Sequence, residues 1–140
     1  MKILVPVDGS ETSTRALKYA VRLAGSSVKP GKVVVVGVDD ALFPGVERKI
    51  GAEATRTLHA ENFERMFAPA KKALARSKVQ VGFVEMVGDI AEGILAAAAK
   101  QKVDLVVMGS RGNGAIRGTL LGSVSMKVLA GTPVPVTIVH

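Results

Sequence analysis

The sequence has no cysteine and no tryptophan, and aromatic residues make up only 4% of its 140 positions. The absence of cysteine excludes a disulfide scaffold, a thiolate metal site and thiol catalysis, and it is typical of a reducing compartment. Because aromatic residues are scarce, the core must be built from Val, Leu, Ile and Ala. With 48% hydrophobic and 22% charged residues, the chain can bury a substantial core, and one domain over residues 1–140 is expected.

Long hydrophobic runs are missing as well. The apolar stretch that follows Met1 is short and ends at Asp8, which is unlike a signal peptide. No stretch reaches the length that is needed to span a bilayer. We therefore expect a cytoplasmic protein that has no membrane partner.

The net charge of +7 raises the question of nucleic-acid binding. The basic residues are spread from Lys2 to Lys127, and the densest group, within residues 71–78, lies at the end of a predicted helix. Cations near a helix C-terminus interact favourably with the helix dipole, and no aromatic stacking platform accompanies the charge. A solvated helix face is therefore favoured, and no nucleic-acid partner is expected.

Short apolar runs alternate with amphipathic segments along the chain. Strands are predicted at residues 3–7, 33–38, 79–87, 105–108 and 134–139, and their β-branched content is typical of strands covered on both faces. Helices are predicted around residues 17–24, with Ser10 or Thr12 as the cap, and over 48–77, with a bend or a new turn at Pro69. Two more are predicted, one from Asp89 to about residue 101 with a capping-box start and one around 124–129.

This alternation predicts an α/β fold, a parallel sheet with helices on both faces. Ligands of such sheets bind beyond the carboxyl ends of the strands, where the strand order reverses. That rule places Asp8, Val38 and Met108-Gly109 along one rim of the sheet.

A glycine-rich segment follows the fourth predicted strand and leads into the last helix. Five glycines fall between Gly109 and Gly122, and glycine lets backbone N–H groups approach a ligand closely. Gly122-Ser123 should begin the last helix, where free N–H groups and the helix dipole favour phosphate, while Arg111 and Arg117 could neutralise its charge. The spacing matches neither a Walker loop nor a dinucleotide fingerprint, and composition alone leaves a surface loop rich in turn residues as the alternative.

The pattern Gly109-x-x-Gly112, nine residues and then Gly122-Ser123 resembles the ATP-binding signature of the universal stress protein family. The opening residues 3–10, the segment Gly88-Asp89-Ile90-Ala91 and the segment 132–136 resemble that family's first strand with its aspartate, the entry to its third helix and the entry to its last strand. The resemblance therefore spans the whole chain. It implies a flavodoxin-like three-layer sandwich of the adenine nucleotide α-hydrolase type, with five parallel strands in the order 3-2-1-4-5.

The resemblance also implies a binding site and an assembly. Asp8 would hold the ribose of ATP, with Gly109 nearby, and the backbone of Val38 would meet the adenine. The complete set of expected nucleotide-binding residues is Pro6, Val7, Asp8, Val38, Met108, Gly109, Arg111, Gly112, Gly122, Ser123 and Val124, of which Gly112, Gly122, Ser123 and Val124 would hold the phosphates, with Mg²⁺ as the expected counter-ion. A homodimer through the last strand, Val134–Val139, is expected, although Pro135 would remove one backbone donor from that strand.

Three functions compete at this stage: a nucleotide-dependent stress sensor or switch, a slow ATPase or autokinase, and a dimeric scaffold without nucleotide. Hydrolysis needs a base or a residue that positions water, and neither His59 nor His140 belongs to a recognisable constellation. The complete glycine pattern argues against the scaffold. A receiver domain of the same fold is set aside, because Asp8 stands alone and the third strand ends without an aspartate.

Two segments have no assigned role. Asp39-Asp40 follows the second predicted strand, where a cation site is conceivable but an ordinary solvated loop is favoured, so that no metal site is predicted. The segment Phe43–Ala60 contains no readable motif and could carry specificity for a partner.

Overall fold

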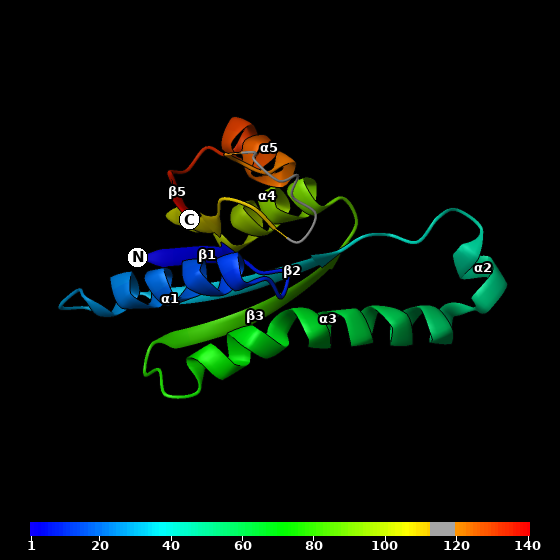
Figure 1. Ribbon diagram of the computed structural model, residues 1–140, viewed down its shortest axis with the longest axis horizontal. Helices are drawn as coiled ribbons and strands as arrows, with labels where there is room; N and C mark the ends of the chain where they lie inside the picture. The colour runs from blue at the N-terminus through cyan, green and yellow to red at the C-terminus, as the bar shows by residue number, and fades with distance from the viewer. Residues whose placement is uncertain (113–119) are drawn as a thin grey trace.

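A computed structural model of the chain describes residues 1–112 and 120–140. The elements follow in the order β1 (Lys2–Pro6), α1 (Glu11–Gly25), β2 (Lys32–Asp39), α2 (Val46–Ile50), α3 (Ala52–Leu74), β3 (Gln80–Val87), α4 (Ile90–Gln101), β4 (Leu105–Gly109), α5 (Ser123–Gly131) and β5 (Val136–Val139). The strands form one five-stranded sheet in the order β3-β2-β1-β4-β5, and every pairing is parallel. The predicted α/β fold and strand order are confirmed (Figure 1).

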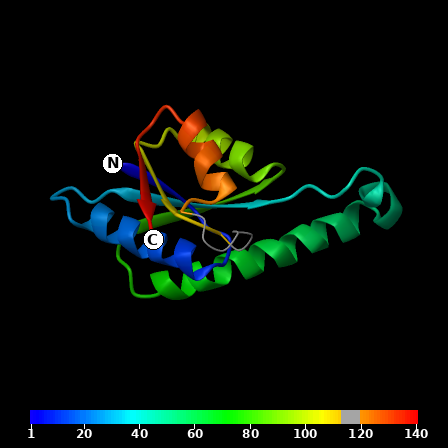
Figure 2. The same ribbon diagram turned by 45° about the horizontal axis from the view of Figure 1, so that its top comes forward.

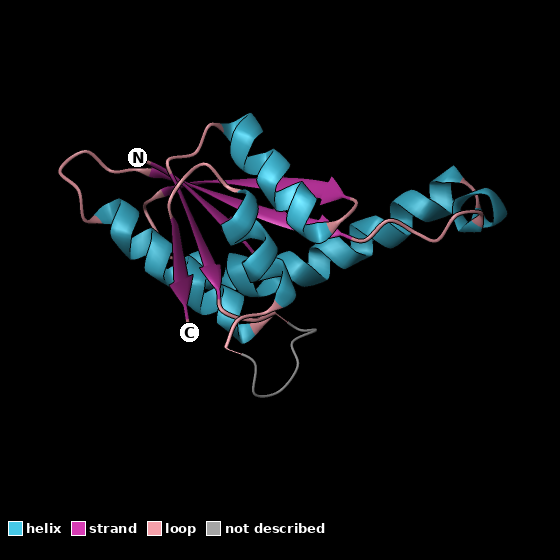
Figure 3. Cartoon of the chain, turned by 90° about the horizontal axis from the view of Figure 1, so that it is seen from above, coloured by secondary structure: helices cyan, strands magenta, loops and turns pink. Residues whose placement is uncertain are grey.

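Helices cover both faces of the sheet. α1 and α3 pack on one face, and α4 and α5 pack on the other, as the view from above shows (Figure 3). Neighbouring residues of β1 point to opposite faces, so Ile3 enters the core beneath α1 while Leu4 enters the core beneath α4. Both are fully buried, and burying such a side chain stabilises the fold by about 1.5–3 kcal/mol.

The expectation that all five strands are covered on both faces is wrong for the two edges. β3 alternates between exposed and half-buried residues, with Phe83 and Val87 among the exposed ones, because it lies at the edge of the sheet. β5 lies at the other edge, and all four of its residues are half-buried. Its first residue is Val136, so Pro135 precedes the strand, and the Pro135 carbonyl accepts from the Val106 N–H over 3.0 Å.

The predicted long helix is divided at a different place from the one expected. Gly51, with φ of +88°, separates α2 from α3, since glycine adopts positive φ without strain. α3 then runs without interruption through Pro69, where a bend or a new turn was expected. Proline lacks the N–H that would bond the Arg65 carbonyl, and Gly9 of the loop after β1 packs against that carbonyl.

α2 and the first half of α3 extend beyond the sheet as an arm (Figures 1 and 2). Its bounds cover most of the segment Phe43–Ala60 that had no readable motif, and Phe43 is 84% exposed. Within residues 1–112 and 120–140, no helix combines the length and the apolar character required to cross a membrane.

Candidate functional site

The strand order reverses between β1 and β4, the neighbours at the centre of the sheet. α1 follows β1 on one face and α5 follows β4 on the other, so the carboxyl ends of these two strands border a crevice of the kind that binds ligands in open α/β sheets. Pro6, Val7 and Asp8 lie at the end of β1, Met108 and Gly109 end β4, and Val38 lies near the end of β2. The structure thus places all of these predicted residues along one rim.

Asp8 occupies the centre of this rim. Its Oδ1 accepts from the Ser10 N–H over 2.9 Å, and Ser10 in turn caps α1 by accepting from the Ser13 N–H over 3.2 Å. The helix cap is therefore Ser10, one of the two predicted candidates, and not Asp8. Gly112 lies so close to the Asp8 Oδ2 that a Cβ at position 112 would overlap it.

The start of α5 presents backbone donors. Gly122 is the N-cap, and among the described residues no side chain caps this helix. Met126 makes the first helical hydrogen bond, to the Gly122 carbonyl over 3.1 Å, so the N–H groups of Ser123, Val124 and Ser125 precede the first bond and point out of the helix end. The Gly122 N–H, expected to be free, instead donates to the Ser110 carbonyl over 2.8 Å.

That bond and a second one hold the glycine segment to the helix. Ser125 Oγ donates to the Gly109 carbonyl over 3.0 Å, and both Ser125 and Ser110 are almost completely buried. A Cβ at Gly122 would be 3.6 Å from the Arg111 Cα and 4.0 Å from the Gly112 nitrogen. The two ends of the predicted pattern, residues 109–112 and 122–123, are therefore in contact.

We call this group of backbone and side-chain atoms, formed by Asp8, residues 109–112 and residues 122–124, the cradle. Arg111 is exposed at its edge, whereas the predicted contribution of Arg117 lies outside the described residues. The cradle combines one carboxylate, several N–H donors at a helix N-terminus and the Ser123 hydroxyl. Such a set binds an anion through the donors and a hydroxyl through the carboxylate.

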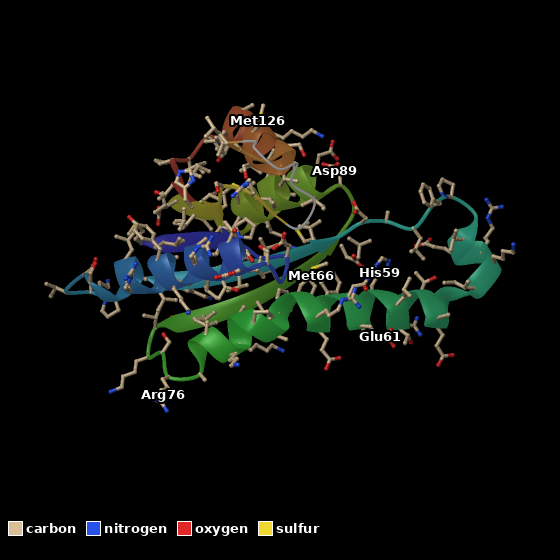
Figure 4. All side chains as sticks on the ribbon, viewed as in Figure 1. His59, Glu61, Met66, Arg76, Asp89 and Met126 are labelled. Carbon is tan, nitrogen blue, oxygen red and sulfur yellow. The ribbon has the colours of Figure 1, made fainter. Side chains whose placement is uncertain are left out.

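Sequence reasoning missed a buried polar cluster beside the cradle. Asp39 was favoured as part of a solvated loop, yet it is the last residue of β2 and only 9% exposed. Its Oδ2 accepts from His59 Nδ1 over 2.7 Å and from Asn62 Nδ2 over 2.8 Å, which ties the end of β2 to α3 (Figure 4). Only Asp40, which is exposed, fits the earlier expectation.

The two ring nitrogens of His59 differ in their surroundings. Because a carboxylate can only accept, His59 Nδ1 carries the hydrogen, and Nε2 is buried without a hydrogen-bond partner in the described part of the chain. The helical spacing of His59 with Phe63 and Phe67 indicates that His59 lies on the buried face of α3. Nothing in the local sequence, however, indicates the contact with Asp39.

The described residues contain no group of three or more side chains of the His, Cys, Asp or Glu type that could hold a metal ion. Two cavities, of about 290 and 550 Å³, lie on the face of the sheet that α1 and α3 cover. Phe83 and Lys71 border the first, and Tyr19 and Arg15 border the second. Neither touches the cradle or gathers a set of converging catalytic groups, so the cradle remains the site with the clearest chemistry.

Comparison with known proteins agrees with this geometry. The model of the universal stress protein family matches residues 1–140. The chain is 31% identical over 138 residues to universal stress protein MJ0531 of Methanocaldococcus jannaschii, which covers 99% of this chain and 81% of that protein. It superimposes with a TM-score of 0.83 on the solved structure of MJ0577 from the same organism, at 31% identity and 99% and 94% coverage. A universal stress protein solved in complex with cAMP gives a TM-score of 0.73 at 26% identity, with 100% and 97% coverage.

Proposed function

Because the chain belongs to the universal stress protein family, we propose that it binds ATP in the cradle and acts as a nucleotide-dependent sensor or switch. One observation carries the proposal: the N–H groups of Ser123, Val124 and Ser125 open onto the same rim as the Asp8 carboxylate. A phosphate supplies the acceptors that the helix end lacks. The cAMP complex of a relative at 26% identity supports an adenine nucleotide as the ligand class.

Each part of the nucleotide has a suitable place. The phosphates bind at Gly112, Gly122, Ser123 and Val124, and the exposed Arg111 adds positive charge. The ribose hydroxyls donate to Asp8.

The adenine lies against the backbone of Val38. The remaining wall of its site is formed by the predicted residues Pro6, Val7, Met108 and Gly109. Mg²⁺ enters with the nucleotide, because this cation keeps several waters and is commonly held through substrate phosphates.

The cradle is suited to holding ATP more than to cleaving it. Among the described residues, Asp8 is the one carboxylate at the cradle, and its Oδ1 is engaged by the Ser10 N–H. His59 is turned toward Asp39 on the α3 side of the sheet. Hydrolysis requires a base that is placed to activate water, and neither Asp8 nor His59 is placed in this way, so ATP turnover is slow. The alternative function is a slow ATPase or autokinase. A scaffold without nucleotide is the remaining alternative.

Assembly and location belong to the same proposal. Within the described residues, β5 pairs with β4 along one side only. Its other side is open to a second copy along Val136–Val139, the part of the expected dimer segment Val134–Val139 that forms the strand. Pairing of two such edges continues the sheet across a homodimer. The protein then works as a cytoplasmic dimer with one cradle in each subunit.

Calorimetric titration with MgATP tests the proposal. Wild-type protein should bind ATP, and Ser123→Ala should weaken binding about tenfold, because one hydrogen bond to a charged group contributes about 1.5–3 kcal/mol. Ser26→Ala, at the far end of α1, is the matched control and should leave the affinity unchanged.

Two substitutions of Gly122 sharpen the test. An added Cβ would lie 3.6 Å from the nearest atom, so Gly122→Ala fits, whereas the branched side chain of Gly122→Val covers the N–H groups and abolishes binding. If millimolar ATP produces no binding heat and no shift of the melting temperature, the cradle does not bind ATP and the proposal is wrong. Rapid release of phosphate would instead establish an enzyme.

A further inference from the structure

The amino ends of the parallel strands meet at the end of the molecule opposite the cradle. Lys2 and Lys32 are register partners in β1 and β2, and Lys32 pairs with Gln80 of β3. The Asp104 N–H, just before β4, donates to the Lys2 carbonyl over 2.8 Å. Segments that are far apart in the sequence therefore lie side by side here, at the left of Figures 1 and 2.

Positive charge accumulates on this part of the protein, which we call the amino-end surface. It carries the cations Lys2, Lys29, Lys32, Arg76, Lys78 and Lys102. Among the residues that the structure describes, Asp104 is the one carboxylate placed with them, and its Oδ2 already accepts from the Lys2 N–H over 2.8 Å. The basic residues looked dispersed in the sequence, but the fold collects them.

Helix ends explain only part of this charge. The C-termini of α1, α3 and α4 point to the same end of the sheet, and each carries about half a negative charge. Together they offset no more than about two of the six cations. Lys2 Nζ donates to the Gln101 carbonyl at the end of α4 over 2.9 Å. Lys29 and Lys32 lie outside the helices, so the amino-end surface keeps an excess of positive charge that needs another counter-charge.

An exposed aliphatic side chain accompanies the cations. Val28 lies in the turn between α1 and β2, next to Lys29, and it is fully exposed. The C-terminal ends of helices and the turns that follow them make up the amino-end surface, whereas many DNA-binding motifs place a helix in the major groove. An apolar tip beside lysines fits the headgroup region of a bilayer, where cations meet lipid phosphates and an aliphatic group enters the interface.

We propose that the amino-end surface binds anionic phospholipid bilayers reversibly, with Val28 entering the headgroup layer and the exposed cations facing the lipid phosphates, namely Lys29, Arg76, Lys78 and Lys102. The cradle, at the carboxyl ends of the strands, then faces away from the bilayer, so nucleotide and lipid can be bound together. This interaction is peripheral and requires no membrane-spanning helix.

Sedimentation with vesicles tests the proposal independently of ATP. The protein should bind phosphatidylcholine vesicles that contain about one third phosphatidylglycerol, but not vesicles of phosphatidylcholine alone. Binding should be lost at high salt, because the Debye length falls from about 10 Å at 0.1 M to about 3 Å at 1 M. Val28→Ser should lower the partition coefficient several-fold.

Two matched charge variants locate the surface. Combined Lys29→Gln, Lys78→Gln and Lys102→Gln should reduce partitioning on the order of a hundredfold, since each cation contributes about fivefold. Combined Arg48→Gln, Lys49→Gln and Arg56→Gln removes the same charge from exposed positions on the arm and should leave partitioning unchanged. Both variants should melt like the wild type, which shows that they are folded.

The proposal is overturned by any of three results. The first is no binding to the anionic vesicles at low salt. The second is an equal loss of binding in the arm variant, which would show that the net charge of the protein, and not the amino-end surface, determines vesicle binding. The third is tighter binding to a short DNA duplex than to the vesicles, with the same dependence on Lys29, Lys78 and Lys102, which would assign the surface to nucleic acid.

Discussion

Substitution of Gly93 by alanine should disturb Val38, the proposed adenine contact beside the cradle. Gly93 is a buried residue of α4 and lies against Val38, whose backbone is the proposed adenine contact. A Cβ at position 93 would be 2.7 and 2.9 Å from the two γ-carbons of Val38 and 3.4 Å from its Cβ. A change of Val38 rotamer gives little relief, because both methyl groups are approached and the χ1 angle of valine is stiff. Either Val38 or α4 has to move.

The magnitude follows from two opposing effects. Overpacking a close-packed core costs about 1–3 kcal/mol, whereas alanine is better than glycine in a helix by about 1 kcal/mol. We therefore expect a net loss of up to about 2 kcal/mol in the free energy of unfolding, and a lower melting temperature by roughly 3–5 °C for each kcal/mol in a chain of this size. A shift of Val38 also misaligns the hydrogen bond to adenine, which should weaken ATP binding about tenfold.

Thermal melting and calorimetric titration of the same samples measure both effects. Gly82→Ala is the matched control: its Cβ would lie 3.7 Å from the Lys32 Cε, which is ordinary contact. It should be neutral or stabilising by up to about 1 kcal/mol and should bind ATP like the wild type. The reasoning is refuted if Gly93→Ala melts as high as the wild type and binds ATP with the same affinity.

Two further substitutions separate binding from stability. Gly112→Ala adds a Cβ that overlaps the Asp8 Oδ2. Because position 112 is exposed, the free energy of unfolding should change by no more than about 0.5 kcal/mol. The ATP affinity, measured by calorimetry, should fall at least about tenfold. Unchanged affinity would mean that Asp8 does not bind the nucleotide. Asp39→Ala removes the acceptor of His59 and Asn62 and should cost about 2–4 kcal/mol in urea unfolding; a loss below about 0.5 kcal/mol would show that Asp39 does not stabilise the fold.

Most of the fold could be predicted from local pattern. The alternation of β-branched runs with helical stripes led to the five parallel strands, whereas their order was expected from the family resemblance alone. The start of α4 at Asp89 was predicted correctly, because the Asp89 side chain accepts from the Glu92 N–H over 3.0 Å, as its spacing indicates. The break at Gly51 was missed, since a single glycine within an amphipathic segment does not by itself indicate positive φ.

The contacts that shape the site could not be predicted in the same way. The glycine spacing pointed to the start of α5, but it did not show that the Gly122 N–H would bond Ser110 or that Gly112 would press against Asp8. The pairing of Asp39 with His59 joins residues twenty positions apart, and it depends on how β2 passes over α3. Tertiary packing decides such pairs, and single-residue propensities do not contain it.

One helix, α3, lies under the β1 and β2 part of the rim and also forms most of the arm. Gly9 packs on Arg65 and Met66, Gly37 packs on Phe67, and Asp39 bonds His59, so α3 contacts both the loop after β1 and the end of β2. The helix has 23 residues and is therefore about 34 Å long. Because α3 is anchored to these two segments and continues into the arm, a tilt of the helix at these contacts would displace α2 at its far end.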